Sequence, residues 1–270
     1  MPVQTSHGKF EIDPAYDEEK DLTKRIDEAR AFLEKNLAII DGIEDNTFQL
    51  ICMFALLDCL AQEQANYPRD SKNAFCQFVL KHQKQCNFLE EVEPITLYYR
   101  VEELIDEVVM IPGIPPGKEV SIEDLGYLYG EKVKDILPKR KAEEILSHIN
   151  RIKGNDFAAR MAKDHQLISL LYRMRSKAVH EMSGLGEIWQ FESRDSFPSE
   201  PYYRDVGRGY LQGEEWVSDD VVELVIPNLF IRNILADCID GYLLDCKEAR
   251  RFPFSNNHIT RKHKLSWYDY

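Results

Sequence analysis

The amino-acid sequence predicts a mainly α-helical protein, with a helical bundle, a helical insertion and a small β-hairpin or strand-like segment. Two observations predict this fold class. Apolar residues recur at helical spacing over most of the 270 residues, and 44% of the chain is hydrophobic. Strand-like patterns are confined to residues 187–225. We expect one domain over 1–270, with 111–153 as an insertion and 251–270 as a polar tail.

Four helices are expected before residue 110. The first spans 18–41, and its apolar stripe contains Leu22, Ile26, Ala29, Phe32, Leu33 and Leu37. The second, over about 47–65, is nearly all apolar and should be buried, with Asp58 as the one charged residue between Phe48 and Leu60. A third is expected over 69–83, and a fourth follows Pro94.

The insertion begins at the strongest helix breaker of the chain, the proline- and glycine-rich stretch 111–117. Residues 121–152 are then predicted to form one or two helices divided near Pro138. The apolar helices on either side favour an insertion within one domain rather than a boundary between two domains.

One helix is predicted over 155–182, with Asn155 as a plausible cap and a glycine-containing stop at 183–186. Residues 187–192 resemble a short strand. The Gly207-Arg208-Gly209 turn indicates further short strand or irregular structure. A long helix over about 226–246 should follow.

Composition excludes several classes of protein. No run of about 18 apolar residues predicts a membrane span, and the acidic first 25 residues do not resemble a signal peptide. We therefore expect a cytoplasmic protein without a membrane partner. The six cysteines form no C-x-x-C pair, so reduced thiols are expected, and Cys52 and Cys59 suggest core packing on one helix face.

Charge is distributed unevenly along the chain. The net charge is −13, yet residues 132–177 hold twelve cations and five anions, a local balance of +7 that leaves −20 for the remainder. Such asymmetry can direct a polyanion to one face. The alternative is that these cations are spread around several helices and form no patch.

The strongest chemical signal is the stretch 173–181, where Arg173, Arg175 and Lys177 precede His180. An imidazole moves protons near neutral pH, and a guanidinium stabilises charge on a phosphoryl group. At about 100° per residue, an undistorted helix places Arg173, Lys177 and His180 on one face, whereas Arg175 and His180 are about 140° apart. The alternative interpretation is an ordinary solvated basic face near a helix C-terminus.

Two further carboxylates accompany this stretch. A charge in an apolar helix needs a partner, so Asp58 is expected to orient His180 or an arginine, or to cap a neighbouring backbone. Glu181 follows His180 directly. No metal-ligand cluster and no cofactor motif is evident in the sequence, so we predict no metal and no cofactor.

The segment Arg175-Ser176-Lys177-Ala178-Val179-His180 resembles the R-x4-6-H signature of the HEPN superfamily, and Arg173 with His180 fits its R-x6-H form. Flanking residues Leu171, Tyr172 and Glu181 extend the likeness, which covers more loosely the apolar helix around Asp58.

The resemblance implies a helical bundle that dimerises and brings two motifs into one cleft. It implies a metal-independent endoribonuclease of a defence or toxin–antitoxin type system, with RNA as substrate and an antitoxin or sensor protein as possible partner. Arg175 and His180 would be catalytic; Arg173, Ser176 and Lys177 would bind substrate; Asp58 and Glu181 would support them. Some members are non-catalytic, so a module that binds RNA, a nucleotide or a protein is the alternative. Met182 stands where members paired with a nucleotidyltransferase antitoxin often have tyrosine.

Overall fold

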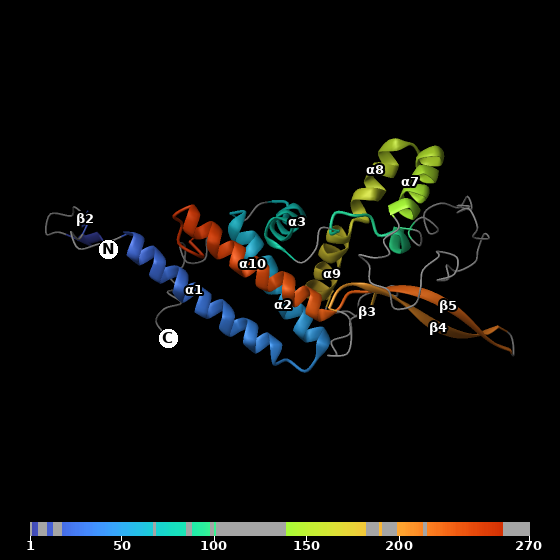
Figure 1. The fold of residues 1–270 in the computed structure, drawn as a ribbon, viewed down its shortest axis with the longest axis horizontal. Coiled ribbons are helices and arrows are strands. Elements are labelled where there is room, and N and C mark those ends of the chain that lie inside the picture. Colours follow the sequence, from blue (N-terminus) through green and yellow to red (C-terminus); the bar gives the residue numbers. More distant parts are fainter. Residues whose placement is uncertain are drawn as a thin grey trace.

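The computed structural model describes residues 2–4, 10–12, 18–66, 69–84, 88–97, 100, 139–181, 189–190, 199–212 and 215–255. Within these residues the protein is mainly helical (Figure 1). The stretch 111–117 and residues 121–138 lie outside them, so the predicted breaker and the division near Pro138 are predictions that the structure does not address.

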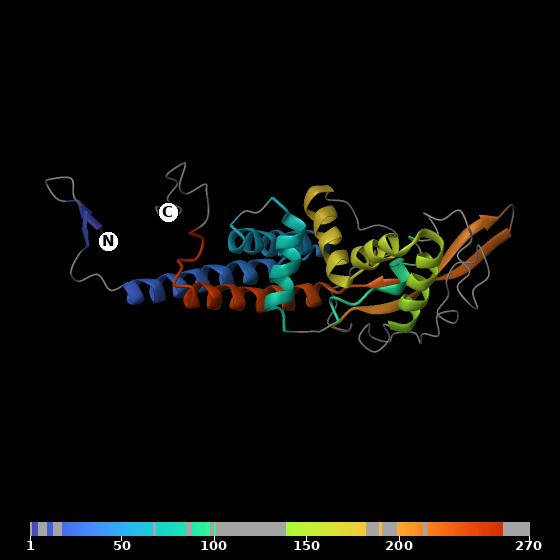
Figure 2. The ribbon, with the colours of Figure 1, turned by 90° about the horizontal axis from the view of Figure 1, so that it is seen from above.

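Three long helices form the central layer: α1 (Glu18–Asp41), α2 (Asn46–Gln64) and α10 (Asn228–Glu248). Both views show α1 and α10 side by side (Figures 1 and 2). They run antiparallel, because Arg232 near the start of α10 binds Asp41 at 3.0 Å and Arg30 of α1 binds Asp240 at 2.6 Å. α2 runs parallel to α10, with the Asn228 amide donating to the Asn46 carbonyl at 2.9 Å.

The helical periodicity of α1 is confirmed, with one exception. Leu22, Ile26, Ala29, Leu33 and Leu37 are buried as predicted, but Phe32 is 58% exposed. Its ring instead meets the Phe254 ring edge-on at 6.3 Å. Phe32 lies about 100° from its neighbour Leu33 around the helix, which places it at the margin of the apolar stripe.

The central helix α2 supplies much of the core, through Leu50, Met53, Phe54, Leu57 and Leu60. Asp45 caps its first turn by accepting a hydrogen bond from the Phe48 amide. Of the two cysteines expected to pack in the core, Cys52 is half-buried and packs against the core, whereas Cys59 is exposed and the prediction for it is wrong. α2 buries one broad face, and these two positions lie beside that face rather than at its centre.

Shorter helices pack on this layer or extend from it. α3 (Ser71–His82) packs against α2, α10 and α9, and Asp70 caps its first turn. α7 (Lys139–Lys153) and α8 (Asn155–Asp164) form a helical hairpin, and α9 (Leu167–Glu181) follows and packs on α2 and α3. Residues 94–97 and residue 100 are helical, where the fourth helix was expected, and residues 98–99 and 101–138 lie outside the described residues.

Two predictions about the segment 155–182 are wrong. The chain forms two helices, α8 and α9, rather than one. Asn155 is the first residue of α8, and Gly154 occupies the cap position with φ 87°. A left-handed φ of this kind favours glycine, which links α7 to α8 in a single residue.

The strand-like segment after the motif helix is a β-hairpin, as predicted. β4 (Tyr202–Gln212) pairs antiparallel with β5 (Glu215–Val225), and β3 (Trp189–Gln190) adds parallel to β5. Gly207 and Gly209 lie inside β4, opposite Asp220 and Ser218, so the turn predicted there is wrong. The pairing of β4 with β5 outweighs the preference of these glycines for a turn. A second, short hairpin joins β1 (Pro2–Gln4) to β2 (Phe10–Ile12).

Candidate functional site

The helix that carries the motif, α9, starts where residues 89–93 form backbone hydrogen bonds with residues 165–168, a contact that we call the clamp. The amides of Leu167 and Ile168 donate to the carbonyls of Glu91 and Leu89, at 3.0 and 2.8 Å. The Glu93 amide donates to the His165 carbonyl at 2.8 Å. These backbone bonds satisfy groups that a continuous helix would pair within itself, which explains why the chain breaks between α8 and α9.

Glu93 anchors that clamp. Its side chain is completely buried, and its two carboxylate oxygens accept from the amides of Ile95 and Thr96, at 2.9 and 2.6 Å. A carboxylate at the start of a helical turn pairs amides that otherwise lack partners. The clamp therefore combines a backbone bridge with a buried cap, and neither is visible in the sequence pattern.

Arg175 lies on the buried side of α9. Its side chain is 8% exposed, and its Nη2 donates to Oδ2 of Asp58, which lies on α2. The sequence left open whether Asp58 orients His180, binds an arginine or caps a backbone; in the structure it binds Arg175. This ion pair joins two helices through residues that are 117 positions apart in sequence.

Tyr172 extends this connection to α3. The Arg175 guanidinium lies 5.6 Å from the centre of the Tyr172 ring, at the i, i+3 spacing where side chains on a helix meet. The Tyr172 hydroxyl is hydrogen bonded to Ser71 Oγ at 2.9 Å, and its ring lies 5.7 Å from that of Phe75. Sequence reasoning did not single out Tyr172 as a contact, although its i, i+3 spacing from Arg175 was available as a signal.

The substrate-binding candidates are less buried than the catalytic candidate Arg175. Arg173 and Lys177 are exposed, and Ser176 is half-buried. His180 and Glu181 belong to the last turn of α9, but their side chains lie outside the described residues. The structure thus brings Asp58 and Arg175 together and separates Arg175 from the exposed pair Arg173 and Lys177.

His165, at the break between α8 and α9, is buried, and its ring is held locally. Its Nδ1 donates to the Met161 carbonyl at 2.8 Å. Burial lowers the pKa of His165 to about 4, an effect that the Met161 carbonyl partly opposes. His165 is therefore neutral near pH 7 and belongs to the packing of the helix junction.

Exposed cations continue onto the two preceding helices. Arg151 and Lys153 are exposed at the end of α7, and Arg160 and Lys163 are exposed on α8. Because α7 packs on α8 and α8 contacts α9, part of the basic segment is carried by three successive helices. Residues 132–138, which hold the rest of its cations before α7, lie outside the described residues.

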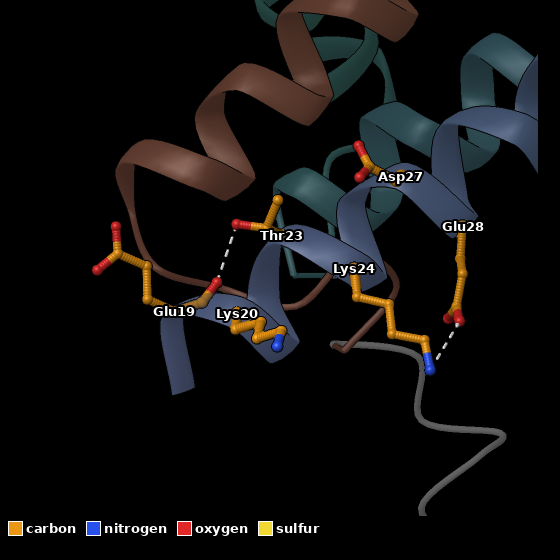
Figure 3. A pocket seen from close by; sticks show the side chains of 6 residues that line it. All are labelled: Glu19, Lys20, Thr23, Lys24, Asp27 and Glu28. Carbon is orange, nitrogen blue, oxygen red and sulfur yellow. Dashed lines mark hydrogen bonds and ion pairs between the residues drawn. The ribbon is translucent and has the colours of Figure 1, made fainter. Parts of the chain in front are cut away.

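The hollow drawn in Figure 3 lies elsewhere, over the first turns of α1. It has a volume of about 600 Å³ and is lined by Glu19, Lys20, Thr23, Lys24, Asp27 and Glu28. Several of its groups already interact with each other: Lys24 lies 3.8 Å from Glu28, and the Thr23 hydroxyl donates to the Glu19 carbonyl at 2.9 Å. Nothing about this open surface of one helix recommends it over α9 as a functional site.

Among the residues that the structure describes, no three histidine, cysteine or acidic side chains converge as a metal site would require. In the same part of the chain, no helix combines the length and the apolar character needed to cross a bilayer. Comparisons of the chain with protein-family models, with curated proteins and with solved structures find no match. The resemblance to the HEPN superfamily therefore rests on the motif residues and their surroundings.

Proposed function

We propose that the protein is a metal-independent endoribonuclease of the HEPN type, acting in defence or stress response. In this proposal the Arg/His motif of α9 cleaves RNA in the cleft of a homodimer. The observation that carries it is the arrangement of α9: the helix is anchored on α2 and α3, exposes Arg173 and Lys177, and continues through His180. Exposed cations on an anchored helix are suited to binding a phosphate chain.

The chemistry requires a proton carrier and a cation. The His180 imidazole takes the proton of a ribose 2′-hydroxyl, and the 2′-oxygen attacks the adjacent phosphorus while the bond to the 5′-oxygen breaks. The leaving 5′-oxygen receives a proton from the imidazolium of His180 in the second motif of the cleft, so both histidines are required. The products are a 2′,3′-cyclic phosphate and a free 5′-hydroxyl, and a guanidinium stabilises the charge that develops on the non-bridging oxygens.

The substitution His180→Ala tests this assignment. Removing a general acid–base group should lower the rate of RNA cleavage by roughly 10²–10⁴-fold, while the melting temperature stays that of the wild type. The measurement is cleavage of a labelled RNA in the presence of a metal chelator, with identification of the cyclic phosphate end.

Lys24→Gln on α1 is the matched control, because it removes an exposed charge at a distance from α9 and should leave cleavage unchanged. Equal cleavage by the wild type and His180→Ala would show that the site is wrongly assigned. Activity that disappears with the chelator would contradict metal independence.

A second candidate function is a non-catalytic HEPN-like module that binds RNA, a nucleotide or a protein partner. The observation that favours it is the ion pair of Arg175 with Asp58, because this buried arginine already binds a carboxylate of the protein. This candidate predicts binding without turnover, with affinity little changed by His180→Gln. Turnover above the level of a His180→Ala control would eliminate it.

A further inference from the structure

The geometry of α9 points to a division of labour between its two arginines: we infer that Arg175 is a positioning residue and that Arg173 contacts the RNA phosphates. This inference rests on the proposed endoribonuclease function, and it identifies which arginine supplies the cation of that site. The motif can be written with either arginine, as R-x4-H from Arg175 or as R-x6-H from Arg173, and their surroundings differ.

The surroundings of Arg175 hold it inside the protein. The residue is 6% exposed, its guanidinium donates to Asp58, and the same guanidinium lies over the Tyr172 ring. Turning this group toward a phosphate would leave the Asp58 carboxylate, itself only 19% exposed, without its cation. Removing one partner of a buried ion pair is strongly unfavourable, so Arg175 stays with Asp58.

The helical register gives Arg173 the opposite placement. At about 100° per residue, Arg173 and His180 lie within about 20° of each other around α9, whereas Arg175 lies about 160° from Arg173. Burial follows this register, since Met174, Arg175 and Ala178 are buried while Arg173 and Lys177 are exposed. The stripe that runs through position 180 is therefore the one that carries Arg173 and Lys177.

Arg175 contributes to the site by setting the rotation of α9. The Asp58–Arg175 pair ties the helix to α2, and the Tyr172–Ser71 hydrogen bond ties it to α3. Two attachments from different helices fix the angle of α9 about its own axis. Loss of one of them would let the exposed stripe turn away from a bound phosphate chain without removing any group that touches it.

The experiment compares single and paired substitutions. Arg175→Met alone leaves Asp58 without a cation and should lower both the melting temperature and kcat. Adding Asp58→Leu replaces the ion pair by two apolar side chains that can pack on each other, an exchange that buried ion pairs often tolerate. The paired variant should recover the melting temperature and at least one half of the lost kcat.

Arg173→Gln is the contrasting variant, because it should change the melting temperature less than Arg175→Met does and still lose cleavage. RNA affinity measured against salt separates the two roles further. For single-stranded RNA, loss of one phosphate contact reduces the slope of log K against log salt by about 0.7. That reduction is expected for Arg173→Gln and not for the Asp58→Leu/Arg175→Met pair, with Lys24→Gln as the remote charge control.

The outcomes distinguish this inference from the proposed function. A paired variant that regains wild-type stability yet remains inactive would overturn the inference and leave the endoribonuclease proposal standing, with Arg175 at the phosphate. Full cleavage and an unchanged salt slope in Arg173→Gln would also overturn it. A wild-type protein that cleaves no RNA would instead remove the proposed function, and the assignment of Arg173 with it.

Discussion

At the scale of single residues, burial decides what each ionisable group can do. Arg175 and Arg173 have the same side chain and lie two positions apart, yet one is enclosed between Asp58 and Tyr172 and the other is exposed. His165 likewise is enclosed, because it ends a helix inside the core. Residue type alone therefore does not identify the group that meets a substrate.

His165 gives the protein a measurable dependence on pH. The folded pKa of about 4 lies below the ordinary value of 6.5, so between these values the unfolded chain binds the extra proton. Stability from this group is complete above pH 6.5 and falls as the pH drops toward 4, by about 3 kcal/mol in all. Urea unfolding from pH 7 to pH 4 should show a shallower decline for His165→Asn than for the wild type. Parallel curves for the two proteins would contradict a neutral buried His165.

At the scale of elements, one close approach fixes how α3 packs on α10. A Cβ at Gly241 would lie 2.2 Å from Nδ1 of His82, whose side chain is buried and hydrogen bonded to Gln64 Oε1 at 3.1 Å. The His82 ring also meets the Phe78 ring at 4.9 Å. Because the histidine is enclosed on several sides, only glycine at 241 lets the two helices lie this close.

Gly241→Ala and Gly154→Ala form an informative pair. Alanine normally favours a helix interior by about 1 kcal/mol, yet at 241 we expect a net loss of about 2 kcal/mol because of overpacking against His82. At Gly154 a Cβ meets nothing within 4 Å, so only its backbone conformation, φ 87° and ψ 166°, costs energy, about 1–3 kcal/mol. Thermal unfolding would measure both. If His82→Ala does not lessen the effect of Gly241→Ala, the close contact is not its cause.

Prediction from sequence was correct where a helical pattern of apolar residues continued over many residues. It was wrong where segments far apart in the sequence meet in the structure. The apolar stripe of α1 and the apolar character of α2 predicted those helices to within a few residues, and the expected helix at 226–246 is α10. The break at 165–166 was missed because its cause, the backbone bridge to residues 89–93, lies about seventy residues away. In the site, the spacing of Arg173, Lys177 and His180 along α9 was predictable, whereas the Asp58–Arg175 pair was one of several open alternatives.

At the scale of the whole molecule, the two ends of the long axis are built from different elements. The hollow over α1 lies toward one end of the long axis, and α7, α8 and the β4–β5 hairpin lie toward the other, with α9 between (Figures 1 and 2). The exposed cations that the structure describes on α7, α8 and α9 thus lie away from the hollow over α1. If these cations bind RNA as proposed, a polyanion is attracted to that part of the molecule.

The proposed cleft makes the dimer itself testable. If two motifs share one cleft, sedimentation should give twice the mass of the chain. Co-expression of wild type with His180→Ala should then reduce cleavage as the square of the wild-type fraction, because mixed dimers lack one histidine. A linear decline would show that each subunit acts alone, and a single-chain mass at working concentration would contradict the shared cleft.

The central place of α10 has a consequence for how the protein is made. This helix packs against α1, α2 and α3, yet it follows α9 and the β4–β5 hairpin in the chain. On a ribosome, the apolar faces of α1 and α2 therefore wait for α10 to emerge before they can be covered. The helix α2, which carries Asp58, is packed on both α1 and α10 only after α10 has been synthesised. A nascent chain that already contains the complete motif therefore still lacks the packed helix that orients Arg175.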